Sequence, residues 1–328
     1  MPRIKNILSF LLRISVSILL LILLFKFNKI DLQVLINDIK CTDKRLLTAG
    51  FLFSFFGYFL GFLRWRMLLK TVGINIPLKR LIGSFSGGIF FSILLPSTIG
   101  GDLVRAADLA EHTKKAKEVI ATIFLDRLSG YMGLVFLILP ALLFGRALVL
   151  DKVVFTSVSV IIILLVIMLL VLFNNNIYSR ITKFLSSPGS GKIKETIKNM
   201  HQEIHVFRNH KRLIILNLFI SFIIQLVGPI SVYFIGLALG IKINFIYFVI
   251  FLPIIGAITL LPIAIGGLGL REGLFVVYFA KAGVVKQLAL AMSLLSFSFV
   301  LFYGAIGGLI YVLTVHHRRL QLNKPSGV

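Results

Sequence analysis

A twelve-residue segment occurs twice in the chain, and it combines residue types that can bind phosphate. The two copies are Leu94–Arg105 and Leu260–Arg271, and seven of their twelve positions are identical, without gaps, at an offset of 166 residues. Each copy has a proline, then a Gly-Gly pair, then an arginine four residues after the second glycine. Leucine and isoleucine matches mean little in an apolar chain. Proline, paired glycines and arginine in the same register indicate an internal duplication.

The chemistry of this motif suits an anion. Proline ends a helix, and two glycines let the backbone turn and approach a ligand closely. A helix that follows such a break presents unpaired N–H groups and the positive end of its dipole. A phosphate could accept these N–H groups together with a bidentate arginine. The predicted substrate-binding residues of the motif are Gly100, Gly101, Arg105, Gly266, Gly267 and Arg271, with Pro96 and Pro262 as the helix breaks.

Carboxylates are scarce enough in this chain to be informative. Only three of the twelve acidic residues fall at plausible membrane depth, and each is near an arginine in sequence: Asp102 with Arg105, Asp126 with Arg127, and Glu272 with Arg271. Charges in spanning segments are costly and usually face a cavity or one another. These acids and Arg127 therefore join the candidate site. The alternative is structural, with Gly-Gly serving close helix packing and each arginine paired with a carboxylate.

Three further features are weaker candidates. Arg64-Trp65-Arg66 has the composition of an anchor at the membrane interface, and a headgroup role is the alternative. Gln225 is expected to make a helix–helix hydrogen bond. Asp108, one turn beyond Arg105, could extend the charged network. No cluster has metal-ligand spacing with enough ligands, because His201 and His205 have no third partner.

The composition indicates that these residues lie in a membrane. The chain is 58% hydrophobic and 14% charged over 328 residues, whereas soluble domains carry roughly 25% charged residues. Its 35 basic and 12 acidic residues give a net charge of +23. On a soluble protein this charge would suggest nucleic acid, but here it indicates loops facing an anionic membrane surface. The single Cys41 excludes an intramolecular disulfide framework.

The hydrophobic pattern predicts an all-α polytopic membrane protein. The stretches long enough to span the membrane are Phe10–Phe27, Leu46–Leu63, Val119–Phe144, Val153–Phe173, Leu213–Gly236 and Leu288–Leu313. Two more apolar stretches, Leu81–Leu95 and Ile243–Leu261, lead into the two motifs. The first would be about 22 Å long as a helix, too short to cross. Both are therefore predicted to be the first arms of re-entrant helical hairpins, and eight full spans are the alternative.

The basic linker predicts the topology. Residues 1–328 are expected to form one transmembrane domain, with repeat halves at about 46–173 and 213–313. The amphipathic linker 174–212 carries eight Lys/Arg and two acids, which predicts a cytoplasmic linker and cytoplasmic termini. In this topology the hairpins enter from opposite sides as an inverted repeat. Their tips then meet near the midplane of the membrane, where transporters bind substrates.

The motifs also resemble a known family. The matching segments are Arg-Trp-Arg at 64–66, Leu-Pro-Ser-Thr-Ile-Gly-Gly-Asp at 95–102 running to Arg105, Asp126-Arg127, and Leu-Pro-Ile-Ala-Ile-Gly-Gly-Leu-Gly-Leu-Arg-Glu-Gly at 261–273. They are similar to the lysylphosphatidylglycerol synthase transmembrane region, the flippase domain of the multiple peptide resistance factor. The resemblance covers nearly the whole chain. It implies a polytopic translocator of aminoacylated or other anionic phospholipids. That factor carries a soluble synthase domain after the membrane region, whereas this sequence stops at Val328. We therefore expect a substrate that this chain does not make.

Together these features predict a lipid flippase or scramblase of the cell membrane rather than an enzyme, with no cofactor and no metal. Its expected partners are a phospholipid headgroup and a separate lipid-modifying enzyme, and not nucleic acid. The chain has no ATP-binding motif, so transport is expected to be passive or coupled to an ion gradient. The alternative is an intramembrane enzyme, similar to a glycosyltransferase, that acts on polyprenyl-phosphate-linked lipids, or a flippase for such lipids.

Overall fold

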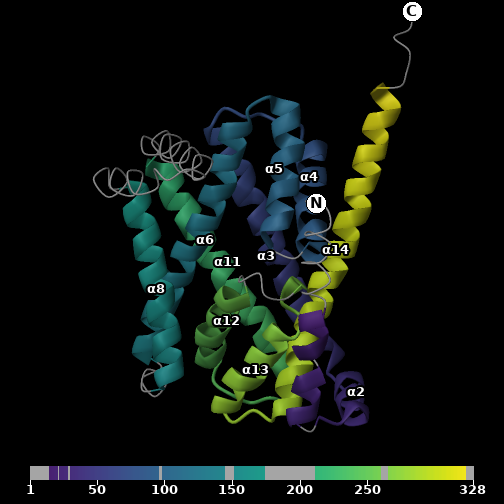
Figure 1. Ribbon diagram of the computed structural model, residues 1–328, viewed down its shortest axis with the longest axis vertical. Coiled ribbons are helices and arrows are strands. Elements are labelled where there is room, and N and C mark those ends of the chain that lie inside the picture. The colour runs from purple at the N-terminus through teal and green to yellow at the C-terminus, as the bar shows by residue number, and fades with distance from the viewer. Residues whose placement is uncertain are drawn as a thin grey trace, which may run out of the picture. The chain divides into compact units, whose positions relative to one another are not determined.

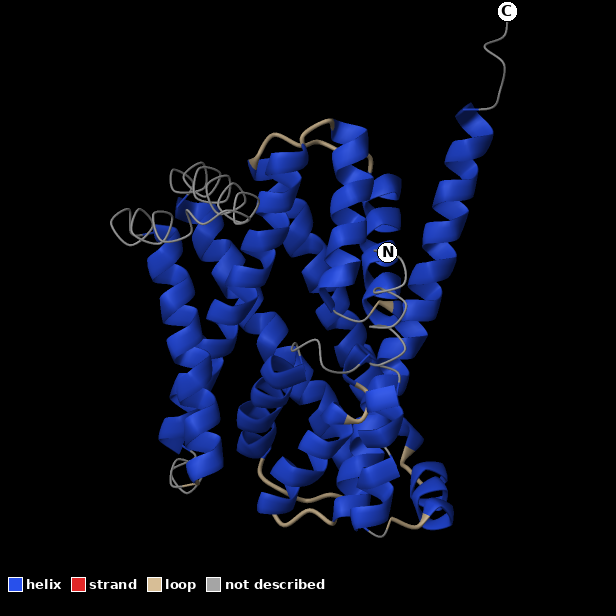
Figure 2. Cartoon of the chain, viewed as in Figure 1, coloured by secondary structure: helices blue, strands red, loops and turns tan. Residues whose placement is uncertain are grey.

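The computed structural model is helical in every regular element that it describes (Figures 1 and 2). The described residues are 15–20, 22–28, 30–95, 98–144, 151–173, 211–259 and 265–322. Within these ranges, four helices are long and apolar enough to cross a membrane: α3 (Lys44–Thr71), α6 (Ala116–Phe144), α11 (Lys211–Ala238) and α14 (Lys286–Leu322, apolar as far as Thr314). The all-α, polytopic prediction is confirmed.

The helices follow the apolar stretches of the sequence and extend beyond them. The predicted spans that begin at Leu46, Val119, Val153, Leu213 and Leu288 lie in α3, α6, α8 (Lys152–Phe173), α11 and α14 respectively. Each of these helices begins one to three residues before its predicted span, and a lysine is among the added residues. Long basic side chains extend from helix ends to the headgroup region, so these added residues cost little. The predicted first span, Phe10–Phe27, is described only from Ser15 on, and Ser15–Asn28 is an apolar helix.

Two pairs of shorter helices form where hairpins were predicted. The first pair is α4 (Leu78–Leu94) and α5 (Thr98–Thr113), and the second is α12 (Phe245–Thr259) and α13 (Leu270–Lys281), with the short helix η1 (Ile265–Gly267) between them. None exceeds 17 residues, which corresponds to about 25 Å of helix against a hydrocarbon core of about 30 Å. Pro96 and Pro262 lie outside the described residues.

The chain forms two compact units that alternate along the sequence. Unit 1 contains Met1–Tyr58, Ile76–Asp108 and Val227–Val328, and unit 2 contains Phe59–Asn75 and Leu109–Leu226. Both copies of the repeated motif belong to unit 1, whereas Asp126 belongs to unit 2. The predicted repeat halves, 46–173 and 213–313, do not coincide with these units and stay a prediction. Most of the predicted amphipathic linker, residues 174–210, lies outside the described residues.

In unit 1, α14 is the helix against which both hairpins pack. It contacts α4 and α13, and in Figure 1 it is the long yellow helix that runs past both. The α4–α14 contact runs through small residues that let the two backbones approach closely. An added Cβ at Gly87 would lie 2.4 Å from the Tyr311 ring, and one at Gly307 would lie 2.7 Å from the Ser86 carbonyl oxygen. The same seam includes Gly83 against Thr314, Gly304 against Ile93 and Gly308 against Phe90.

The second hairpin has an aromatic core instead. Phe248 and Phe251 of α12 pack against Phe279 of α13 with ring centroids 5.1 and 5.5 Å apart. All three side chains are fully buried. Such pairs contribute about 0.5–1.5 kcal/mol each beyond the area that they bury. The α12–α13 hairpin is therefore held by large side chains, and the α4–α14 contact by small ones.

The short helix α2 (Leu32–Lys40) closes one end of unit 1. Asp31 caps it, accepting hydrogen bonds from the Gln33 and Val34 N–H groups. Asp38 accepts a 2.9 Å hydrogen bond from Gln287 Nε2 at the start of α14. The C-cap residue of α2 is the exposed Cys41, which precedes α3.

Candidate functional site

In the first copy of the motif, the two glycines lie inside a helix. Because α5 begins at Thr98, Gly100 and Gly101 belong to its first turn, and Arg105 is its eighth residue. A Cβ at Gly101 would lie 2.0 Å from the Gly88 carbonyl oxygen of α4. These glycines therefore serve close packing of α4 on α5. The sequence analysis predicted that the helix begins after Gly-Gly. This is wrong for the first copy, because α5 begins at Thr98 and already contains both glycines.

Arg105 is buried and paired within its own helix. Its side chain lies 2.9 Å from the Asp102 carboxylate, one turn earlier, and the residue is only 6% exposed. Its Cδ lies 3.3 Å from where a Cβ of Gly88 would be, so the glycine makes room for the arginine stem. Asp108 lies 3.8 Å from Arg80 of α4. Charged groups from both arms of the first hairpin therefore gather in the same helix pair.

In the second copy, the glycines form a turn before the helix. Gly266, Gly267 and Gly269 have φ values of 57°, 74° and 81°, a left-handed conformation that costs other L-residues about 1–2 kcal/mol. Helix α13 then begins at Leu270, so Arg271 is its second residue. For this copy, the predicted geometry of Gly-Gly turn followed by a helix start is seen.

The N-terminus of α13 already binds a carboxylate from its own first turn. Glu272, which is fully buried, accepts a 2.6 Å hydrogen bond from the Gly269 N–H. Arg271 donates to the same carboxylate through Nε, at 3.1 Å, and through its terminal nitrogen. The Arg271 guanidinium also lies 4.0 Å from the centre of the Phe297 ring of α14, a cation–π contact. Arg271 is thus held by a charge and by a ring.

The two hairpins approach each other at their breaks. The short helix η1 contacts α4, and a Cβ at Gly266 would lie 3.7 Å from the Ile93 carbonyl oxygen, one residue before the end of α4. Both copies belong to unit 1. The end of α4 and the short helix η1 therefore meet within this unit, while residues 96–97 and 260–264 at the tips lie outside the described residues and the predicted meeting near the membrane midplane stays a prediction.

A third buried ion pair lies in unit 2, with a partner that the sequence analysis did not assign. Asp126 of α6 accepts a 2.8 Å hydrogen bond from Arg64 Nε of α3. Arg64 also donates to Ser221 Oγ of α11 at 2.9 Å. Arg64 and Asp126 are 8% and 7% exposed. The prediction paired Asp126 with its neighbour Arg127, which is half-buried on α6.

Arg64 and Trp65 are not an interfacial anchor, because Trp65 is fully buried and Arg64 nearly so. The anchor interpretation is wrong for these two residues. Arg64 lies 62 positions before Asp126, so the spacing of the two residues in the sequence did not indicate that they pair. The one available signal was that a buried acid on α6 needs a buried cation. Gln225 is as predicted: its Nε2 donates to the Gly130 carbonyl oxygen of α6 at 2.9 Å.

Residues 10–308 match the family described as the lysylphosphatidylglycerol synthase TM region. The chain belongs to this family. Its relatives include a UPF0104 membrane protein of Pyrococcus horikoshii, 23% identical over 77% of this chain and 82% of the relative. A UPF0104 membrane protein of Methanothermobacter thermautotrophicus is 26% identical over 70% of this chain and 73% of the relative. The resemblance found in the motifs is confirmed.

For this member of the lysylphosphatidylglycerol synthase TM region family, membership indicates a membrane role related to lipid. Among the described residues, the Arg–carboxylate pairs with at least one buried member include two in unit 1 and one in unit 2. They contain no group of three or more His, Cys, Asp or Glu that could hold a metal ion. An arginine that is already paired can bind a phosphate through its remaining N–H donors or by exchanging its carboxylate for the phosphate. The arrangement is therefore suited to reversible anion binding, and also to holding helices together.

Proposed function

We propose that this chain moves an anionic or aminoacylated phospholipid between the leaflets of the cell membrane. The headgroup phosphate would bind at the meeting tips of the two hairpins in unit 1, while the acyl chains stay in the lipid. One observation carries the proposal. Two apolar hairpins break at the same motif, meet at η1 and α4, and each holds an arginine on a neighbouring carboxylate, with Arg105 buried in the first and Glu272 buried in the second. Membership in the family supports a lipid substrate.

Partner exchange gives this geometry a mechanism. Two oxygens of a phosphate can accept a bidentate pair of N–H groups from a guanidinium, as the two oxygens of a carboxylate do. When Arg271 turns to phosphate, Glu272 keeps its hydrogen bond from the Gly269 N–H, so the acid is not left alone in an apolar environment.

The substrate-binding set comprises Gly100, Gly101, Asp102, Arg105, Gly266, Gly267, Arg271 and Glu272 in unit 1. Asp126 and Arg127 in unit 2 were predicted as members on their sequence alone. Because Asp126 is bound to Arg64, we propose that this third pair undergoes the same partner exchange within its own unit.

Both termini are proposed to be cytoplasmic, because the basic linker 174–212 favours that side.

Transport by purified protein in liposomes tests the proposal. A fluorescent phosphatidylglycerol analogue would be followed with a quencher that reaches only the outer leaflet. Arg105→Gln and Arg271→Gln should each slow transbilayer movement about tenfold or more, because a hydrogen bond to a charged group is lost. The matched control is Lys115→Gln, which removes an exposed cation just beyond α5.

Size-exclusion chromatography would confirm that each variant is folded. Unchanged movement in both arginine variants would reject the site, and no movement of any phospholipid by the wild-type protein would reject the activity. Mass spectrometry of the recovered lipids distinguishes the enzyme alternative, because an enzyme would leave a chemically altered headgroup. A polyprenyl-phosphate probe in the same assay distinguishes a flippase for that lipid class.

A further inference from the structure

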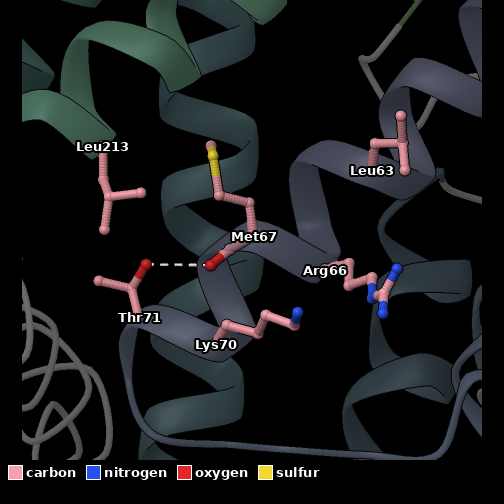
Figure 3. A pocket seen from close by; sticks show the side chains of 6 residues that line it. All are labelled: Leu63, Arg66, Met67, Lys70, Thr71 and Leu213. Atoms are coloured by element: carbon pink, nitrogen blue, oxygen red, sulfur yellow. Dashed lines mark hydrogen bonds between the residues drawn. The ribbon is translucent and has the colours of Figure 1, made fainter.

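Unit 2 contains a pocket that is separate from the repeated motif. It lies between the last two turns of α3 and the first turn of α11 and has a volume of about 480 Å³. Its lining residues are Leu63, Arg66, Met67, Lys70, Thr71 and Leu213 (Figure 3). This volume falls within the range of roughly 300–1,000 Å³ that is typical of ligand pockets. The pocket combines two cations with three apolar side chains.

The two cations of the pocket differ from the other arginines of the spans. Arg66 is half-buried, and Lys70 lies one helical turn farther along α3 on the same side (Figure 3). Within the described part of the chain, neither side chain has an ion pair or hydrogen bond. Like charges at this spacing repel by a few tenths of a kcal/mol on an isolated helix. An anion between them would remove that repulsion.

The pocket lies where the apolar part of both helices ends. The apolar stretch of α3 finishes at Leu63, so Arg66 and Lys70 come in the polar turns that follow. Helix α11 starts with Lys211 and Arg212, and its apolar stretch begins at Leu213. Residues at such positions lie at the level of the headgroups, directly beside the first acyl carbons. The pocket has cations on one side and apolar side chains on the other, as expected of a site at the boundary between lipid headgroups and acyl chains.

We propose that this α3–α11 pocket binds the phosphate of an anionic phospholipid from the surrounding bilayer. Arg66 and Lys70 would contact the phosphate, and Leu63, Met67 and Leu213 would contact the start of an acyl chain. The Thr71 hydroxyl donates to the Met67 carbonyl oxygen at 2.9 Å, which leaves the two cations as the available donors. The inference does not depend on the proposed transport, because this pocket is in unit 2 and the motif is in unit 1.

Native mass spectrometry of the full-length chain in detergent tests the proposal. Phosphatidylglycerol and phosphatidylcholine with identical acyl chains would be titrated separately. In Arg66→Ala/Lys70→Ala, the affinity for phosphatidylglycerol should fall about 25-fold, because the phosphate loses two direct contacts, each contributing roughly 1 kcal/mol. The matched control, Lys44→Ala/Arg45→Ala, removes the same two residue types from exposed positions at the other end of α3. It should bind as the wild type does.

Equal losses in both double variants, or none in either, would overturn the proposal, because the effect would then reflect net charge or nothing at all. Arg66→Lys/Lys70→Arg retains both charges and should retain most of the binding, which separates loss of the site from loss of the fold. Inorganic phosphate added at the lipid concentration should leave the lipid bound, because it lacks the acyl contact. If inorganic phosphate displaces the lipid, and does so only when Arg66 and Lys70 are present, the pocket binds soluble phosphate and the lipid assignment is overturned.

Discussion

The Gly-Gly pair of the first hairpin lies within a helix, whereas the same pair in the second hairpin forms the turn before one. In the first, Gly101 lets α5 approach the Gly88 backbone. In the second, Gly266 and Gly267 adopt left-handed conformations. The arginine that follows is consequently two turns into α5 but in the first turn of α13. Identical glycine pairs in equivalent positions therefore have different roles. The first pair allows two helices to pack closely, and the second allows the backbone to turn before a helix begins.

The residues between the glycines and the arginine explain this difference. The first copy continues with Asp102 and Leu103, and the second with Leu268 and Gly269. A glycine in a helix costs about 1 kcal/mol relative to alanine, so three glycines within four residues oppose helix formation in the second copy. Helix α13 starts only after the last of them. Its first turn then supplies Glu272, which occupies the helix N-terminus.

The largest expected effect comes from removing the acid of the second copy. Glu272→Ala removes the acceptor of the Gly269 N–H and leaves Arg271 without its carboxylate, so unfolding in mixed micelles should become easier by about 3–5 kcal/mol. Glu272→Gln keeps an acceptor at the helix cap and should recover about 1 kcal/mol of that loss. Asp102→Asn should recover less relative to Asp102→Ala, because Asp102 lies inside α5, whereas Glu272 accepts the Gly269 N–H at the start of α13. Equal recovery in both copies would refute the difference in role.

Alanine substitutions at Gly101 and Gly267 should separate the effect of close helix packing from the effect of a left-handed backbone. Gly101→Ala places a methyl group 2.0 Å from a backbone oxygen and should destabilise the protein by about 1–3 kcal/mol. Gly267→Ala meets no atom closer than 3.4 Å and should cost about 1–2 kcal/mol, through its left-handed backbone alone. Retention of the folded monomer after heating, read by size-exclusion chromatography, compares the two.

Asparagine at the same positions sharpens this test. It tolerates the left-handed region better than alanine does, so Gly267→Asn should be more stable than Gly267→Ala. Gly101→Asn should be less stable than Gly101→Ala, because the larger side chain meets the same backbone. The same order at both positions would show that the two glycine pairs have one role after all.

The smallest expected effect concerns the ring beneath Arg271. Phe297→Leu removes the cation–π contact at 4.0 Å and should cost about 0.5–2 kcal/mol. A double-mutant cycle with Arg271→Gln should show coupling of that size, and a cycle with Arg105→Gln should show none. Coupling to Arg105 of equal strength would mean that Phe297 acts through the hairpin as a whole.

Much of the fold follows from hydrophobic length and helix breaks, because these properties are local. The spans beginning at Leu46, Val119, Val153, Leu213 and Leu288, and the two short hairpins, were predicted from such patterns. The pairs Asp102–Arg105 and Arg271–Glu272 were predicted for the same reason, since their members lie within one helical turn. Gln225 was assigned correctly because an amide within a span needs a neighbouring helix.

Contacts between residues far apart in the sequence could not be predicted from hydrophobic length and helix breaks. Arg64 lies 62 positions before Asp126, and only the packing of α3 on α6 brings them together. The adjacent Arg127 was the nearer candidate in sequence, and its sequence position gave no indication that Arg64 also pairs with Asp126. The role of Gly101 was similarly hidden, because it depends on Gly88, thirteen residues earlier on another helix. Sequence spacing specifies contacts within a helix, whereas contacts between helices require the fold.

The exposed Cys41 has a practical consequence for these questions. It is the only cysteine of the chain and lies in the polar segment directly before α3, so a membrane-impermeant maleimide reports on one position without any mutagenesis. Because α3 is a continuous helix of 28 residues, the side on which Cys41 reacts also assigns Arg66 and Lys70 to the opposite side. Labelling from outside the cell would place both cations at the inner leaflet. A single natural thiol thus serves as a sidedness marker for the α3–α11 pocket.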